Sequence, residues 1–184
     1  MKKVILFAAM AFVAVTGFAQ NKFAHVDFNE LIYLMPEMDS AREIMDAAQL
    51  EAQETYESMV EEFQSKYSQY QQKAETWTAS IRESKERELT DIQNRIEEFN
   101  QSVQQELSQR QQELLMPIQQ KAQETVQAIA KAAGYVYVFD VASLLYFDES
   151  QSVNITPEAR KALNIPEGRT LDSLQAELAA KQQQ

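Results

Sequence analysis

The sequence predicts a mainly helical α+β fold, in which a long antiparallel helical hairpin projects from a small β body. Three observations support this fold. The chain from Glu37 to Ala133 contains no glycine and a single proline. Apolar residues recur there at steps of three and four, which is typical of helices with one buried face. Short segments of strand-forming composition flank this region, at residues 22–27 and 135–139.

Residues 1–19 are predicted to be a cleaved signal peptide. Two lysines precede an apolar run, Val4–Val15, and the segment ends in the small residue Ala19. The run is too short to span a bilayer, so a cleaved signal is favoured over a membrane anchor. No cysteine stands beside the cleavage site to carry the lipid of a lipoprotein. We therefore expect an exported mature chain that begins at Gln20 and has no stable membrane insertion.

The composition argues against several classes of function. Loss of the two signal-peptide lysines would leave 15 of the 17 basic residues against 28 acidic ones, a net charge of −13. This balance argues against nucleic acid and anionic membrane surfaces as partners. The absence of cysteine excludes disulfides, thiolate metal sites and cysteine nucleophiles. His25 is the only histidine and no glycine-rich phosphate loop occurs, so we expect no enzyme, metal or cofactor.

The first part of the β body is expected at residues 20–36. Lys22–Asp27 alternates apolar and polar residues as a strand does. Asp27, with Glu30 three residues later, resembles the capping box that begins a helix. This short helix then meets Pro36, which interrupts it or restarts it.

The second part of the β body is expected at residues 134–165. Gly134 is a good helix stop, and Tyr135–Phe139 is the strongest strand signal in the chain, apolar on both faces. Ser143–Phe147 is predicted to form a third strand. Residues 166–184 then form a tail, either a short surface helix or a disordered segment.

Three short strands cannot shield a sheet that is apolar on both faces, because the long helices extend away from it. We therefore expect strands from several subunits to close around a common core. The side chains predicted to make this oligomer interface are Phe23, Val26, Val136, Tyr137, Val138, Phe139 and Leu145.

The hairpin arm is expected at residues 37–133, with its tip near residues 78–84. No glycine or proline marks the turn, but Ser80 with Glu83 could cap a second helix. Pro117 should bend that second helix. One continuous helix in a parallel coiled coil is the alternative. The hairpin is favoured because the strands on either side of the helical region must meet in order to pair.

Aromatic residues follow the apolar stripe of the first arm helix. One interpretation is packing in the seam between the two helices. The other is contact with a bound partner, because a two-helix arm buries only one stripe and leaves the ring edges exposed. The residues predicted to make this contact are Tyr56, Phe63, Tyr67, Tyr70 and Trp77.

In the order and spacing of these features the chain resembles the Skp/OmpH family of periplasmic chaperones, over about residues 22–165. The resemblance rests on the opening strand, a leucine after it, the long hairpin, the return strand, a Leu-Tyr pair and an Asn-Ile-Thr before a last helix. These segments are Lys22–Asp27, Leu31, Tyr135–Asp140, Leu145–Tyr146 and Asn154–Thr156.

The resemblance implies a jellyfish-shaped homotrimer, in which a β body on the threefold axis carries three helical tentacles around a cavity. It implies an ATP-independent holdase that binds unfolded outer-membrane β-barrel proteins in the periplasm and prevents their aggregation. A structural coiled-coil spacer of the cell envelope is the alternative. Members of that family are basic, whereas this chain is acidic and residues 82–88 mix both signs. The acidic charge argues against attraction to lipopolysaccharide.

Overall fold

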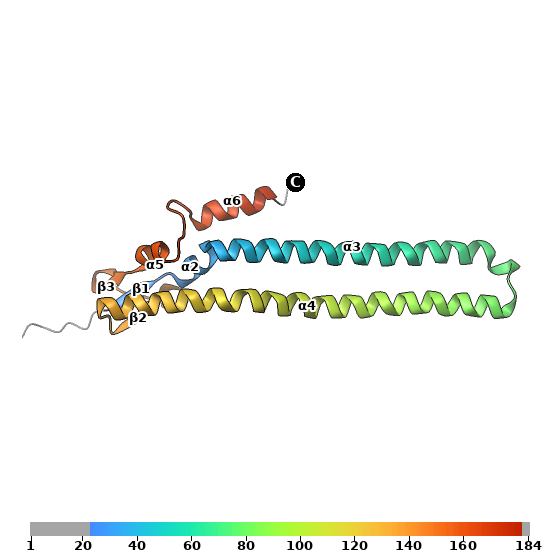
Figure 1. Cartoon of the computed structure of the whole chain (residues 1–184), viewed down its shortest axis with the longest axis horizontal. Helices are drawn as coiled ribbons and strands as arrows, with labels where there is room; N and C mark the ends of the chain where they lie inside the picture. Colours follow the sequence, from blue (N-terminus) through green and yellow to red (C-terminus); the bar gives the residue numbers. More distant parts are fainter. Residues whose placement is uncertain (1–22, 182–184) are drawn as a thin grey trace, which may run out of the picture.

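A computed structural model of the chain describes residues 23–181. Two long helices, α3 (Pro36–Lys73) and α4 (Ala79–Ala133), lie side by side and antiparallel, and the body sits at one end of them (Figure 1). The predicted mainly helical fold is therefore confirmed. The signal peptide expected at residues 1–19 lies outside the described residues.

The body contains a three-stranded sheet in the order β2-β1-β3, built from β1 (Phe23–Val26), β2 (Tyr137–Asp140) and β3 (Ser152–Asn154). Both strand pairs are parallel, and Phe23 stands opposite Tyr137 and Ser152. Parallel strands need a long crossover. Here the whole arm is that crossover, because the hairpin returns the chain to the end at which β1 begins (Figure 1).

The prediction of a strand at Ser143–Phe147 is wrong. Val141–Ser143 forms the 3₁₀ turn η2, Glu149–Gln151 forms the 3₁₀ turn η3, and the third strand is Ser152–Asn154. Each strand needs a neighbouring edge that supplies hydrogen bonds. The two edges of β1 are occupied by β2 and β3, and within the described chain nothing pairs with residues 144–147.

The return strand begins two residues later than predicted. Gly134 ends α4 in the left-handed conformation, with φ of 71°. The Tyr135 N–H donates to the Ala130 carbonyl at 3.0 Å and the Gly134 N–H to the Lys131 carbonyl at 3.3 Å. This Schellman-type cap holds Tyr135 against the helix end, so pairing with β1 begins only at Tyr137.

The N-cap predicted at Asp27 is confirmed. Its Oδ1 accepts the Glu30 N–H at 2.8 Å and begins α2 (Phe28–Leu34). Met35 is extended, with φ of −61° and ψ of 140°, and Pro36 then occupies the first position of α3. The Glu30 side chain does not complete a capping box with Asp27; it pairs with Arg160 of α5 (Thr156–Ala162).

The arm turns slightly earlier than predicted. α3 ends at Lys73, the 3₁₀ turn η1 covers Ala74–Thr76, and Thr78 caps α4 by accepting the Ile81 N–H. Ser80, the predicted cap, lies inside α4. The Trp77 ring packs edge-on against Tyr70, with centroids 6.0 Å apart, and this contact fixes the chain just before Thr78.

The hydrophobic core lies in the body and at the root of the arm. Its largest fully buried side chains there include Leu31, Leu34, Met35, Ile155 and Leu163, from α2, its junction with α3, and the segment around α5. Residues from α4 complete it, at the helical spacing Ile118, Ala122, Val126 and Ile129. Farther along the arm, Ile92 alone among the described apolar side chains is buried. The body and the root of the arm are therefore well packed, whereas the rest of the arm is a two-helix projection with little fully buried surface.

Candidate functional site

One face of the sheet is an exposed aromatic surface. Phe23, Tyr137 and Phe139 form a cluster in which ring centroids lie 6.0–6.3 Å apart. Tyr137 is 59 % exposed and Phe139 40 % exposed. These three rings, called here the aromatic face, contact one another because alternate residues of parallel strands point to the same side.

The opposite face of the sheet is covered within the subunit. Ala24 and Val26 are buried in the same cluster as Val126 and Ile129 of α4, and Val138 packs against that cluster. Within one subunit, therefore, only one of the two apolar faces of the sheet is buried, and burial of the other face between subunits remains a prediction. Val136 precedes the strand and is exposed.

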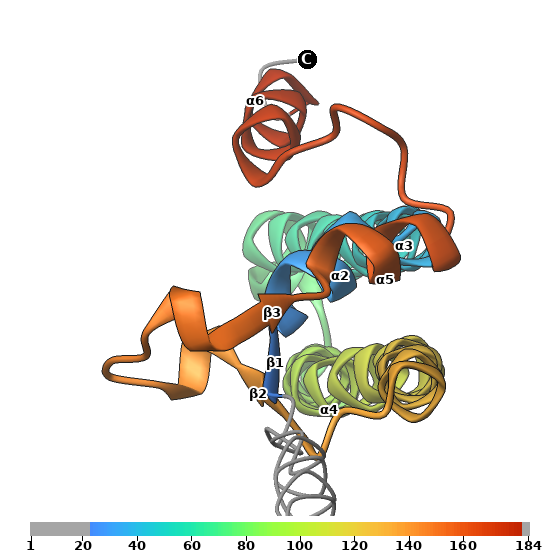
Figure 2. The same cartoon turned by 90° about the vertical axis from the view of Figure 1, so that its left-hand side faces the viewer.

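The connection between β2 and β3 carries a second exposed apolar feature. It projects away from the helices (Figure 2). Within it, Leu145 is fully exposed and Tyr146 is largely exposed. Asp140 and Asp148 fold the two ends of the connection by accepting the N–H groups of Ala142 and Ser150. The exposed Leu-Tyr pair adds a second apolar feature to the surface of the body.

His25 has a structural environment. Its Nδ1 lies 2.9 Å from the Ser152 Oγ, and its ring packs against Phe147 with centroids 4.7 Å apart. Across residues 23–181, no cluster of three or more histidine, aspartate and glutamate side chains is arranged to hold a metal ion. His25 therefore links β1 to β3 and to the projecting connection.

The aromatic residues predicted on the arm all lie on or near its surface. Phe63 stacks on Tyr67, with centroids 5.9 Å apart, and Tyr67 is 45 % exposed. Tyr56 is also exposed, whereas Tyr70 and Trp77 are half-buried against one another near the tip. Phe63 with Tyr67 and Tyr70 with Trp77 form two ring pairs, and none of the five predicted rings is buried. Contact with a bound partner remains a prediction.

Polar pairs connect the two helices in the distal half of the arm. Glu62 pairs with Arg95 at 3.0 Å, and Lys66 pairs with Glu88. Hydrogen bonds from Lys66 and then Lys85 lower the pKa of Glu88 to about 2. Together with the buried Ile92 and half-buried seam residues such as Leu89 and Ile96, these pairs connect the two helices.

A docked C-terminal helix is the feature that the sequence left undecided. α6 (Leu171–Lys181) lies alongside α3, on the side opposite α4 (Figures 1 and 2). Leu174 is only 6 % exposed and joins the core. The leucines at 171, 174 and 178 are the sequence signal for this face, at the spacing of one helical stripe.

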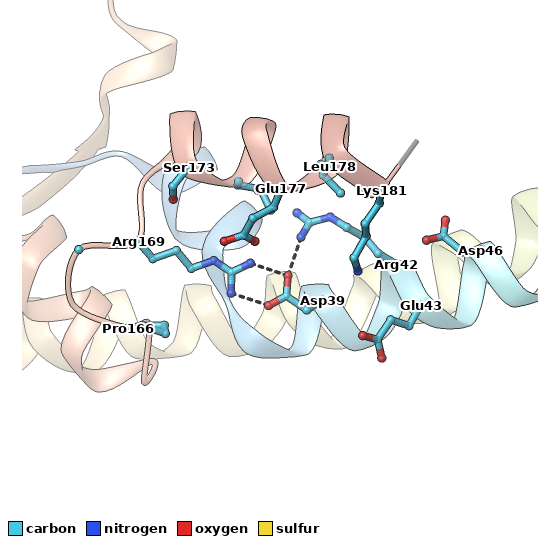
Figure 3. A pocket seen from close by; sticks show the side chains of 12 residues that line it. Asp39, Arg42, Glu43, Asp46, Pro166, Arg169, Ser173, Glu177, Leu178 and Lys181 are labelled. Carbon is cyan, nitrogen blue, oxygen red and sulfur yellow. Dashed lines mark hydrogen bonds and ion pairs between the residues drawn. The ribbon is translucent and has the colours of Figure 1, made fainter. Parts of the chain in front are cut away.

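An ion pair fastens the segment before α6 to α3. Arg169 donates to both carboxylate oxygens of Asp39, at 2.5 and 2.6 Å, and Arg42 donates to Asp39 at 2.7 Å (Figure 3). The hydrogen bond from Arg169 holds the pKa of Asp39 below its usual value. A cleft of about 560 Å³ remains between α6 and α3, with Glu43, Asp46 and Lys181 on its walls (Figure 3).

Among the helices described, none is both long enough and apolar enough to span a membrane. A comparison with curated proteins gives no match. A comparison with protein families matches residues 22–163 to the family described as Outer membrane protein (OmpH-like). The match covers the sheet, both arm helices and α5, and it ends before α6. The chain therefore belongs to the OmpH-like family, whose members are periplasmic chaperones of outer-membrane proteins.

Proposed function

We propose that this protein is an ATP-independent holdase that binds unfolded outer-membrane β-barrel proteins in the periplasm. In this proposal three copies assemble through their bodies, and their arms surround a cavity in which the client is held. Family membership supports the class of function. The assembly and the mode of holding rest on two surfaces of this chain.

The aromatic face and the Leu145–Tyr146 pair support assembly. They place large apolar side chains in water on a body that is otherwise packed. Burying apolar surface contributes about 25 cal/mol per Å². A cluster of this kind on a small body is typical of an interface between subunits. We propose a second copy as the partner. Each body carries both the aromatic face and the exposed Leu145–Tyr146 pair, so apolar surfaces of neighbouring copies can cover one another.

The exposed edges of the arm aromatics support client holding. Tyr56, Phe63 and Tyr67 lie on a helix surface that also carries many charged groups. Single contacts with such rings are weak, but many of them within a confined space add to useful affinity. The mature charge of −13 expected from the sequence gives no general attraction for acidic clients. Holding then depends mainly on apolar contact.

The single observation that carries the proposal is the combination of an uncovered apolar body face with a long arm whose apolar side chains beyond the root are, apart from Ile92, at most half-buried in the described chain. A spacer protein would need neither. The test measures molar mass by light scattering, together with the aggregation of a urea-unfolded β-barrel protein after dilution. We expect a trimer that suppresses aggregation without ATP. A monomer, or a trimer with no effect on aggregation, would favour the spacer alternative.

Two variants separate the two surfaces. Tyr137→Asp places a charge in the aromatic face, so we expect it to dissociate the oligomer. Phe63→Ser with Tyr67→Ser should preserve the trimer and weaken suppression of aggregation. Tyr33→Ser is the matched control for both, because Tyr33 is an exposed aromatic residue of α2 outside both surfaces. Equal holding by the arm variant and the control would contradict the role of the arm rings.

A further inference from the structure

Each side of the arm has a weak point near its root. On one side, the extended Met35 separates α2 from α3. On the other side, Pro117 inside α4 removes a backbone donor, which makes the helix easier to bend. Lys121, one turn after Pro117, pairs with Glu37 beside Pro36. Because α3 and α4 run antiparallel, Pro117 lies one turn farther out along the arm than the level of Glu37, so the two breaks are offset along the root of the arm. The stretch between them, residues 35–37 and 117–121, is called here the hinge.

The segment that leads to α6 is held by the body on one side of this hinge. Arg160 of α5 pairs with Glu30 of α2 and also donates to the carbonyls of Pro166 and Arg169. Leu163 and Ile165 are buried in the core just before this point. Residues up to Arg169 are thus fixed to the part of the molecule that precedes the hinge.

The same segment is held by the arm on the other side of the hinge. Arg169 makes its bidentate pair with Asp39, one turn into α3. Arg42, on the next turn, donates to the same carboxylate. α6 then continues along α3 until Lys181 lines the same cleft as Asp46 (Figure 3). α6 therefore lies against α2 on the body side of Met35 and along the first turns of α3 on the other side.

We propose that residues 166–181 form a strap that restrains the angle between the arm and the body. The strap lies beyond residue 163, where the match to the family ends. In an assembly of several copies the arm angle sets the width of the space between arms. When residues 166–181 are bound to α3, one arm angle is favoured. When they are released, the arm angle varies over a wider range. The proposal does not depend on client binding, because the angle can be measured without a client.

The test measures a distance across the hinge within one subunit. Cysteines introduced at Glu158 on α5 and Gln104 on α4 are both exposed, and the natural chain has no cysteine to interfere. Spin labels on these positions report the distribution of body–arm distances by electron paramagnetic resonance. An excess of unlabelled protein ensures that labels in different subunits do not contribute.

Two variants release the strap in different ways. Arg169→Gln removes the bidentate pair with Asp39, and Leu174→Ser weakens the apolar contact of α6 with the core. Hydrogen exchange of the α6 amides reports release, and we expect exchange to accelerate roughly tenfold for Arg169→Gln, as for loss of a partly exposed charge-assisted pair. We expect the body–arm distance distribution to broaden in both variants. Asp46→Asn is the control: it removes a charge from the same cleft wall, but Asp46 makes no ion pair in the described part of the chain.

Each combination of α6 amide exchange and body–arm distance distribution either supports the strap or overturns it. Faster exchange in α6 together with a broader distance distribution supports the strap. Faster exchange with an unchanged distribution overturns it, because α6 would then be bound to α3 without restraining the arm. If neither variant accelerates exchange, the contacts named here do not fasten α6, and the proposal also fails. A double variant with Asp39→Asn should add little to Arg169→Gln, because both remove the same pair.

Discussion

Lys66 of α3 and Glu88 of α4 form an ion pair that crosses the distal half of the arm. Glu88 also accepts a hydrogen bond from Lys85 on its own helix, at 2.8 Å. The pair is partly exposed, so its contribution to stability is modest and is weakened by salt. It nevertheless lies where the arm has few buried apolar contacts, and a modest contribution matters there.

Acid should loosen the distal arm before it affects the body. The pKa of Glu88 falls from its usual 4.5 to about 2 in the folded arm, because Lys66 and Lys85 donate to it. A lowered pKa stabilises the fold above pH 4.5, and this stabilisation is lost as the pH falls from there towards 2. Hydrogen exchange near the tip should therefore accelerate over this window. Glu88→Gln should show fast exchange at neutral pH and a smaller further change with acid; an unaltered pH profile would contradict the assignment.

Gly168→Ala should destabilise the docking of α6. Gly168 has a φ of 82°, a conformation that costs an L-residue about 1 kcal/mol relative to glycine. Apart from its two chain neighbours, nothing lies within 4 Å of a Cβ added at Gly168, so the effect would come from the backbone and not from a clash. Exchange of the α6 amides should accelerate several-fold, whereas Glu167→Ala, at an exposed neighbouring position, should leave it unchanged. Equal exchange in the two variants would contradict the prediction.

Truncation of a leucine should have very different effects in the packed body and on the exposed surface of the arm. Leu31 is fully buried, so Leu31→Ala should cost about 2–5 kcal/mol in the free energy of unfolding. Leu50 is exposed on α3, so Leu50→Ala should change it by less than about 0.5 kcal/mol. Urea denaturation at one fixed protein concentration measures both values, because assembly makes stability depend on concentration. Similar losses in the two variants would mean that the arm is packed more tightly than its burial shows.

Local signals in the sequence predicted the elements that depend on local chemistry. Asp27 caps α2 and Gly134 ends α4, because a side-chain acceptor and a glycine act on backbone groups a few residues away. The position of the turn in the arm was harder to predict from local sequence signals. Ser80 with Glu83 reads as the better capping pair, but the contact between Trp77 and Tyr70 brings the turn forward to Thr78.

Features that depend on distant partners could not be read locally. Ser143–Phe147 has the composition of a strand, but composition does not say whether a free sheet edge is within reach. The docking of α6 also depends on a distant partner. Its leucine stripe indicates a helix with a buried face, whereas the pair between Arg169 and Asp39 joins residues 130 positions apart. The surfaces for assembly and client contact remain predictions, because they concern molecules outside a single chain.

The response of client binding to salt follows from the charge of the chain. With 28 acidic residues, and 15 basic ones after loss of the signal peptide, the arms repel acidic segments of a client on average. The attraction that remains comes from rings such as Tyr67 and Phe63, and apolar contact is not screened by salt. Raising salt from 50 to 500 mM shortens the screening length on the order of threefold. The affinity for an unfolded β-barrel protein should then be unchanged or slightly higher.

Fluorescence anisotropy of a labelled client at both salt concentrations, with and without ATP, makes this measurement. ATP should have no effect at either salt, because no glycine-rich phosphate loop is present in the sequence. Phe63→Ser with Tyr67→Ser should weaken binding by the same factor at low and high salt, since the contact it removes is apolar. A collapse of binding at high salt would show that electrostatic attraction dominates, and a basic surface would then have to carry the client in place of the arm rings.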